Sequence, residues 1–155
     1  TVPLTFLNFS NYTDSCVAFF NFLIRYSLQM ADEQVIFEQT LAAIEAEVRG
    51  FGSYTDIRKS KDVEVHRLML SKKLDNAKLQ VATFNSREML FEHELTDYSQ
   101  FDIIMEQWSP FNLLWKTTYL WLTSYDTWMN GPFDEVNGMK VEELGKSIQK
   151  RNTKA

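Results

Sequence analysis

Apolar residues recur at alternating steps of four and three between residues 70 and 95, and this repeat constrains the fold more than any other feature. A 3.5-residue repeat places its members on one side of an α-helix, where they interlock with a neighbouring helix. We therefore expect a long helix, beginning near Asp56 or Ser60, that packs on a roughly antiparallel neighbour. The positions of the repeat are Leu70, Leu74, Ala77, Val81, Phe84, Glu88, Phe91 and Leu95.

The preceding segment supplies a suitable neighbour. Its polar turn ends in Thr13 and Asp14, either of which can accept hydrogen bonds from the first free amides of a helix. We expect that helix to run to Val48, with room for a break near Met30, and to end in the glycine-containing segment 49–53. Its packing face also has steps of four and three. The face consists of Phe37, Leu41, Ile44, Val48 and Phe51.

Composition agrees with a helical chain. The 155 residues include only 5 Gly and 3 Pro, too few for the many tight connections of a β-sandwich or barrel. With 45% hydrophobic residues, the chain can bury a core as one globular unit. We predict an all-α fold, an elongated bundle of about four to five helices. Because the chain begins without Met and ends on a basic run, we expect a piece of a longer protein.

The last third of the chain contains all four tryptophans. The pair Thr96-Asp97 can cap a short helix over 98–108, and Ser109-Pro110 suits the N-cap and first position of a second helix. The pair Gly131-Pro132 suits a C-terminal stop. The sequence thus predicts a separate helix over 110–129, about 30 Å long at a rise of 1.5 Å per residue.

That helix has a broad aromatic half on a wheel of 100° per residue. One stripe holds Phe111, Trp115, Tyr119, Leu122 and Met129; the stripe beside it holds Leu114, Trp121, Tyr125 and Trp128. The opposite half is polar apart from Leu113 and Leu120. So wide a face suits a helix between two or more neighbours. We therefore interpret the tryptophans as packing residues rather than a ligand cage, a membrane belt or a nucleic-acid stacking platform.

Charge and hydrophobicity argue against the last two alternatives. The net charge of −5 leaves no basic face for phosphate contacts, so we expect no nucleic-acid binding. The aromatic segment has Lys116 as its one cation, whereas a helix docked on a membrane needs several. The most apolar stretch, 16–24, is far shorter than the ~20 residues of a membrane span. We expect no membrane partner.

No motif predicts catalysis or cofactor binding. The sequence contains no glycine-rich phosphate loop and no nucleophile elbow. Cys16 is the only cysteine, so neither an internal disulfide nor a multi-cysteine zinc site can form. Glu88 and Glu92 share a helical face and could contribute to a metal site, but a solvated face is the favoured interpretation. We expect no catalytic, cofactor-binding or metal-ligating residue.

The segment 84–143 resembles dynein heavy chains, in the tail region where the part leading to the linker begins. Four motifs occur in the family's order: Asn-x-Arg-Glu-x-Leu-Phe, Thr-Asp-Tyr, Pro-Phe-x-x-Leu-Trp and Trp-x-x-x-Tyr-x-x-Trp-x-x-x-Pro-Phe. Residues 31–48 also resemble the preceding tail helix of axonemal heavy chains. The motif residues that we take as candidate structural sites are Asn85, Arg87, Glu88, Pro110, Phe111, Leu114, Trp115, Trp121, Tyr125, Trp128, Pro132 and Phe133.

The resemblance implies a single non-catalytic tail fragment over 1–155. Residues 1–107 would form a tail helix pair and a short connecting helix, and 108–155 the Trp-rich helix and the start of a linker-proximal basic helix. ATP, Mg²⁺ and microtubules would be bound by distant parts of the parent motor. The implied partners are other parts of the heavy chain and intermediate or light chains, or an actin–light chain complex, in the cytoplasm and cytoskeleton of a ciliary or flagellar axoneme.

Two other hypotheses remain open. A binding module would use the aromatic face to dock a light chain or partner helix. Burial of Trp115, Trp121 and Trp128 favours packing, whereas one open stripe favours docking. An unrelated spectrin-like repeat is the third hypothesis. Under the packing hypothesis, Trp115→Ala or Trp128→Ala costs about 3–5 kcal/mol.

Overall fold

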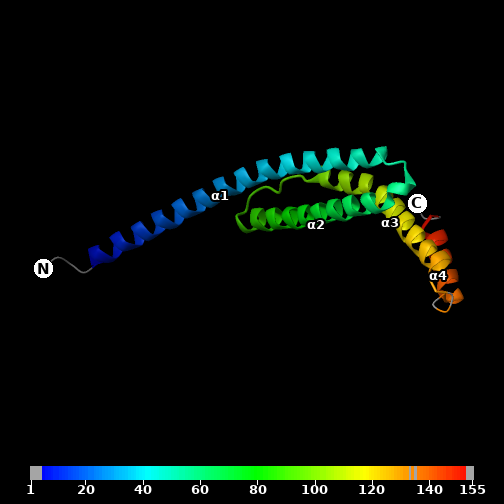
Figure 1. Ribbon diagram of the computed structural model, residues 1–155. Coiled ribbons are helices and arrows are strands. Elements are labelled where there is room, and N and C mark those ends of the chain that lie inside the picture. Colours follow the sequence, from blue (N-terminus) through cyan, green and yellow to red (C-terminus); the bar gives the residue numbers. More distant parts are fainter. Residues whose placement is uncertain (1–4, 133, 135, 153–155) are drawn as a thin grey trace. The chain divides into compact units, whose positions relative to one another are not determined.

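The computed structural model describes residues 5–132, 134 and 136–152, with side chains from Asp14 to Lys150. This part of the chain contains four α-helices, two short 3₁₀ helices and no strand. The predicted all-α helical bundle is confirmed. In chain order, the helices are α1 (Thr5–Gly50), η1 (Phe51–Ser53), η2 (Ile57–Lys59), α2 (Ser60–Leu90), α3 (Ser99–Asn130) and α4 (Gly138–Asn152) (Figure 1).

The chain divides into two compact units, one ending at Thr40 and the other beginning at Leu41. The boundary lies inside α1, so the described part of the first unit is one helical segment. The second unit contains the last turns of α1 and every later helix. The expected subdivision between residues 107 and 108 stays a prediction.

Helix α1 begins earlier than expected. Thr13 and Asp14 lie inside it, and the helix continues through Met30 without interruption. The predicted N-terminus and the predicted break were therefore wrong. A physical reason is that the segment 5–30 contains neither Gly nor Pro, the two residues with a large helix penalty. Capping residues favour a helix end, but they do not force one.

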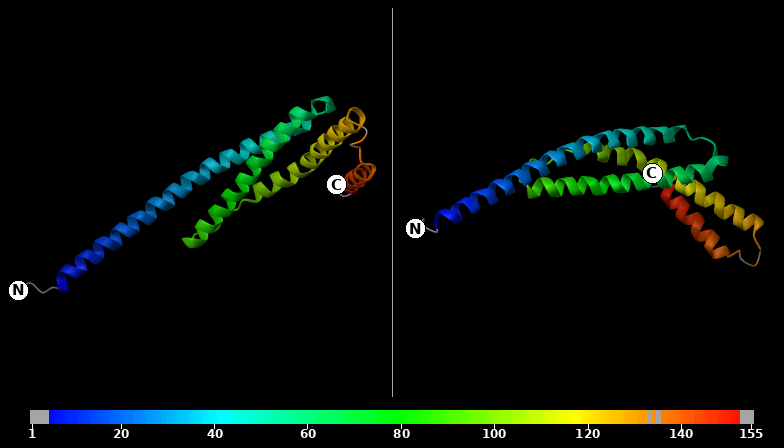
Figure 2. Two further views of the ribbon diagram at one scale, coloured as in Figure 1. Left: turned by 60° about the horizontal axis from the view of Figure 1, so that its bottom comes forward. Right: turned by 60° about the vertical axis from the view of Figure 1, so that its left-hand side comes forward.

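The core of the second unit lies where the last turns of α1, helix α2 and the first half of α3, taken as residues 99–115, run side by side (Figures 1 and 2). The apolar repeat of α2 forms one wall of this core from Leu70 to Glu88, which confirms the predicted packing face over that range, whereas Leu95 is exposed. The main neighbour of α2 is α3 rather than the preceding helix that was expected. The buried apolar residues are Leu41, Ile44 and Val48 from α1, Phe51 from η1, Val63, Leu70, Leu74, Ala77 and Phe84 from α2, Tyr98 before α3, and Phe101, Ile104, Trp108 and Trp115 from α3.

Helix α2 ends before its apolar repeat does. Beyond Leu90 the backbone turns: the amide of Glu92 donates to the carbonyl of Met89 at 3.3 Å, and the amide of His93 to the carbonyl of Glu88 at 2.9 Å. This is the hydrogen-bond pattern of a Schellman cap, with Glu92 at φ 54° in the left-handed position that usually holds Gly. Glu92 therefore does not continue the helical face of Glu88, and the shared-face prediction was wrong.

Helix α3 joins the two helices that were expected to be separate. Pro110 lies inside it rather than at the start of a new helix. An interior proline removes one backbone hydrogen bond and bends a helix, and the axis of α3 changes direction part-way along (Figure 1). Because Trp108 and Trp115 are buried on either side of Pro110, tertiary packing holds the helix together across a residue that usually ends one.

Helix α4 follows a short connection and runs back alongside the second half of α3 (Figure 2). The side chain of Asn137 caps it by accepting hydrogen bonds from the amides of Met139 at 3.0 Å and Lys140 at 3.4 Å. The apolar side chains Val141, Leu144 and Ile148 are half-buried. A helix was expected in this region, as the start of the basic segment.

Candidate functional site

An aromatic corner forms where α1 ends and the middle of α3 passes. Phe51 meets Trp108 edge to face, with ring centroids 4.8 Å apart, and meets Tyr54 at 5.1 Å. Tyr54 in turn meets Trp115 edge to face at 6.3 Å. Such pairs add to the free energy of simple area burial. The two tryptophans of the first half of α3 are therefore fastened to the turn that follows α1.

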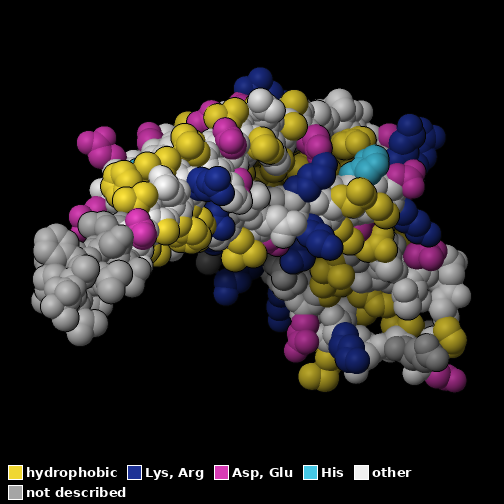
Figure 3. Space-filling view, turned by 90° about the vertical axis from the view of Figure 1, so that its left-hand side faces the viewer, with side chains coloured by type: hydrophobic (Ala, Val, Ile, Leu, Met, Phe, Trp, Pro, Cys, Tyr) yellow, Lys and Arg dark blue, Asp and Glu magenta, His cyan; other side chains and the backbone are white. Residues whose placement is uncertain are grey.

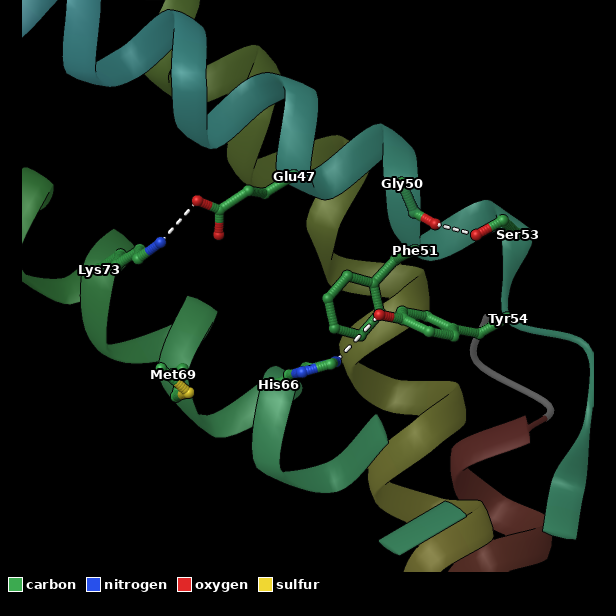
Figure 4. A pocket seen from close by; sticks show the side chains of 8 residues that line it. All are labelled: Glu47, Gly50, Phe51, Ser53, Tyr54, His66, Met69 and Lys73. Carbon is green, nitrogen blue, oxygen red and sulfur yellow. Dashed lines mark hydrogen bonds and ion pairs between the residues drawn. The ribbon is translucent and has the colours of Figure 1, made fainter. Parts of the chain in front are cut away.

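A hollow of about 400 Å³ opens beside this corner (Figure 4). Its polar groups bond to one another: Tyr54 Oη and His66 Nδ1 share a hydrogen bond of 2.9 Å, Lys73 Nζ lies 2.5 Å from Glu47 Oε1, and Ser53 donates to the Gly50 carbonyl. The hollow is lined by Glu47, Gly50, Phe51, Ser53, Tyr54, His66, Met69 and Lys73.

A buried ionic network ties α2 to α3. Arg67 holds both oxygens of Glu64 at 2.7 Å and donates from its remaining nitrogen to Asn112 Oδ1 at 2.6 Å. The planar guanidinium suits this forked geometry, which fixes orientation as well as position. Asn112 comes two residues after Pro110, so the network fastens α3 just beyond its bend.

Sequence reasoning missed this network because Arg67 and Asn112 are far apart in the chain. One pattern could have revealed Arg67. The apolar repeat of α2 extends backwards through Val63 and position 67 with the same steps, which places an arginine among core residues. A charged residue in a core position requires a partner.

Glu88 is the second buried charged residue, only 2% exposed. Its carboxylate accepts hydrogen bonds from the Thr96 amide at 2.9 Å and from Thr96 Oγ1 at 2.5 Å. It thus anchors the connection that leads into α3. The solvated face favoured for Glu88 was therefore wrong. Among the described residues, no group of three or more His, Cys, Asp or Glu side chains is placed to hold a metal ion.

The two aromatic stripes of α3 differ in exposure. In the first stripe Trp115 is 4% exposed and Phe111, Tyr119 and Leu122 are half-buried, although Met129 at its end is 63% exposed. In the second stripe Leu114, Trp121 and Tyr125 are 58%, 43% and 49% exposed. Trp121 stacks on Tyr125 at 6.4 Å and meets half-buried Trp128 edge to face at 6.0 Å. The second stripe is thus an ordered aromatic surface that reaches solvent. Figure 3 shows one face of the molecule, on which hydrophobic side chains lie at the surface among acidic and basic ones.

The expected polar half of this helix is partly covered. Thr117 is 7% exposed, and Leu113, Leu120 and Ser124 on the same side are half-buried. The prediction of an apolar half and a polar half was therefore too simple. Small side chains allow close approach of a neighbouring helix, and α4 is the helix alongside this part of α3 (Figure 2).

Comparison with known proteins identifies relatives of this chain. Dynein axonemal heavy chain 1 of Rattus norvegicus is 23% identical over 116 residues, which is 75% of this chain and 2% of that protein. Dynein axonemal heavy chain 12 of Homo sapiens is 27% identical over 120 residues, 73% of this chain and 4% of that protein. This chain is related to axonemal dynein heavy chains. The relation confirms the resemblance, and it leaves the unrelated spectrin-like repeat without support.

Other comparisons define the extent of this relation. Dynein axonemal heavy chain 3 of Mus musculus is 35% identical over 77 residues, which is 49% of this chain and 2% of that protein. The dynein-related chain thus spans between 2% and 4% of the length of these relatives. No family model matches the sequence, and no solved structure is similar to it.

The family-motif residues of this dynein-related chain fall into three groups by exposure. Phe133 lies outside the described residues. Glu88 and Trp115 are buried; Asn85, Arg87, Phe111 and Trp128 are half-buried; and Pro110, Leu114, Trp121, Tyr125 and Pro132 are exposed.

None of the described helices combines the length and apolar character that crossing a membrane requires.

Proposed function

We propose that this chain is a non-catalytic structural segment of an axonemal dynein heavy chain, in the tail next to the linker. Its role is to couple an ATP-driven motor ring to the anchor of the motor. The single observation that carries the proposal is the way α3 is fastened on both sides of Pro110. Trp108 and Trp115 pack into the aromatic corner, and Asn112 bonds to buried Arg67.

This arrangement suits force transmission. A packed protein interior has low compressibility and transmits strain. A load on the second half of α3 would pass through the ring contacts of Trp115 to Tyr54, and through Asn112 to α2. One route leads to the turn that follows α1 and the other to α2, and both start or end at a buried side chain, Trp115 or Arg67, and pass through a half-buried one, Tyr54 or Asn112.

The rest of the proposed function follows from the dynein relation. ATP and Mg²⁺ would be bound in a motor ring outside this segment, and microtubules would be contacted by distant parts of the motor. The partners would be other parts of the heavy chain and intermediate or light chains, or an actin–light chain complex. The location would be the cytoskeleton of a ciliary or flagellar axoneme.

The test compares ATP turnover with movement in the full-length heavy chain. We expect Asn112→Ala to leave microtubule-stimulated ATP hydrolysis close to normal and to slow microtubule gliding, because the motor ring is intact but its coupling is weakened. Thr123→Ala, at an exposed position of the same helix, is the matched control. Gliding at the normal rate with Asn112→Ala, or loss of ATP hydrolysis with normal protein yield, would contradict a coupling role.

A second candidate function is supported by the open aromatic stripe. Leu114, Trp121 and Tyr125 reach solvent, and this exposure favours docking of a light chain or partner helix. Large aromatic anchors dominate such interfaces. We expect Trp121→Ser with Tyr125→Ser to keep the melting temperature within a few degrees and to reduce co-purification of accessory chains with the heavy chain. Unchanged co-purification would remove this candidate.

A further inference from the structure

Helix α1 carries a second heptad repeat within the first unit, on residues that the sequence patterns above did not use. The repeat alternates between steps of four and three, which is the spacing of residues that interlock with another helix. We call this line of residues the outer seam. It consists of Val17, Asn21, Ile24, Leu28, Ala31 and Val35.

All six residues of the outer seam are exposed. Val17, Leu28 and Val35 are 59%, 63% and 54% exposed, although each is a large apolar side chain. The helix is continuous beneath them, so the seam is a preformed surface. A contiguous apolar surface of this kind usually marks an interaction site. Met30 and Phe37, by contrast, are buried on a different face of the same helix.

The middle of the seam has two features of a helix-binding surface. Asn21 occupies a seam position, and a polar residue at such a position fixes the register of a coiled coil at some cost in stability. Beside it lies a hollow of about 510 Å³ that could receive a side chain of a partner helix. The hollow is lined by Ala18, Asn21, Phe22, Ile24 and Arg25.

Charges at the ends of the seam decide what kind of helix fits. Asp14 precedes Val17 in the same register and Glu38 follows Val35, so a carboxylate stands at each end. Both side chains are exposed. A second copy of this chain would place acid opposite acid in either orientation, because Asp14 would face Asp14 when parallel and Glu38 when antiparallel. Like charges at facing positions oppose association.

We propose that the outer seam docks a helix from outside these 155 residues, with a three-heptad apolar repeat and a Lys or Arg near each end. The apolar steps provide the contact surface, and the basic ends pair with Asp14 and Glu38. A polar residue opposite Asn21 sets the register. This site is separate from the aromatic stripe of α3, and it does not depend on the proposed coupling function.

The test uses the 155-residue chain and two fluorescein-labelled peptides in an anisotropy titration. Both peptides have a three-heptad Leu repeat with Asn at the position facing Asn21; one has Lys at both ends and the other has Glu. A scrambled peptide of the same composition as the Lys peptide controls for general attraction to an acidic protein. We expect saturable binding of the Lys peptide, with the Glu peptide at least about tenfold weaker and the scrambled peptide weaker still.

Matched variants locate the site. Ile24→Glu and Leu28→Glu should each weaken binding of the Lys peptide at least about tenfold, whereas Ile36→Glu, on an exposed residue of the same helix outside the seam, should leave it unchanged. Circular dichroism should be the same for all three variants, because the substituted residues are exposed. The proposal is overturned if the Lys peptide does not bind, if the two peptides bind equally, or if Ile36→Glu weakens binding as much as Ile24→Glu.

Sedimentation equilibrium tests the alternative that the seam binds a second copy of this chain. The proposal expects the chain alone to be monomeric at the concentrations of the titration. A dimer that Leu28→Glu dissociates would show that the seam binds a second copy, and it would overturn the basic-ended partner.

Discussion

The two halves of α3 have similar aromatic content and opposite environments. In the first half, Trp108 and Trp115 are 3% and 4% exposed and meet rings from the segment after α1. In the second half, Trp121 and Tyr125 stack on each other and remain 43% and 49% exposed. Aromatic residues at helical spacing therefore show that a helix has something to bury, but the neighbouring elements decide which rings are buried.

The largest expected effect separates two tryptophans of the same helix. We expect Trp115→Ala to lower the free energy of unfolding by about 3–5 kcal/mol, because it leaves a cavity in the aromatic corner. Trp121→Ala should cost less than about 1 kcal/mol, because the side chain is partly solvated. Half-buried Trp128 should fall between them. Urea denaturation of the variants measures the difference. Equal losses of unfolding free energy for Trp115→Ala and Trp121→Ala would contradict the claim that only the first half of α3 is packed in the core.

The second-largest expected loss of stability comes from breaking the ionic network that fastens α3 beyond Pro110. Arg67→Ala leaves Glu64 without its partner, and the two side chains are only 8% and 13% exposed. We expect a loss of about 3 kcal/mol. Lys73→Ala is the control, since Lys73 and Glu47 are 47% and 45% exposed and their pair should contribute less than about 1 kcal/mol. Similar melting temperatures for the two variants would show that the ionic network does not stabilise the first half of α3.

A smaller effect concerns the entry into α3. Thr96→Val removes the hydroxyl that donates to buried Glu88 but keeps the amide that also donates. We expect a loss of about 1–2 kcal/mol, because a buried carboxylate loses one of its donors. The control is Thr83→Val, whose hydroxyl only bonds to the Leu79 carbonyl on the exposed side of its own helix. Thermal unfolding that does not separate the two variants would contradict an anchoring role for Glu88.

The smallest effect depends on pH and concerns the turn before α2. Hydrogen bonds from the Arg58 side chain and then from its backbone amide hold the pKa of Asp56 below its usual value. A lowered folded pKa means that the stabilisation is present at neutral pH and is lost as pH falls through that pKa. The melting temperature of Asp56→Asn should thus lie slightly below that of the wild type at pH 7, and the two should converge in acid. A constant difference down to pH 2 would exclude this cause.

Much of the fold could be predicted because it depends on local patterns. The repeat of α2, the apolar face of α1 from Phe37 to Phe51 and the scarcity of Gly and Pro all indicated packed helices. The limits of the helices were less predictable. Thr13 and Asp14 looked like a start and Pro110 like a break, yet α1 and α3 continue through them. In α1 the preference of about 1 kcal/mol for a cap does not end the helix, because the segment 5–30 contains no Gly or Pro. In α3 the penalty of about 3 kcal/mol for a proline is offset by the packing of Trp108 and Trp115 on either side of it.

The sequence by itself determined that this is an all-helical chain related to axonemal dynein heavy chains, because helical periodicity and ordered motifs are properties of neighbouring positions. Only the tertiary structure decided that Arg67 reaches Asn112, that Glu88 is buried against Thr96, and that Trp115 of one aromatic stripe is covered while Trp121 and Tyr125 of the other are open. Exposure and ion pairing depend on which segments distant in sequence come together. A helical wheel describes one helix, and it contains no information about the neighbour that covers each face.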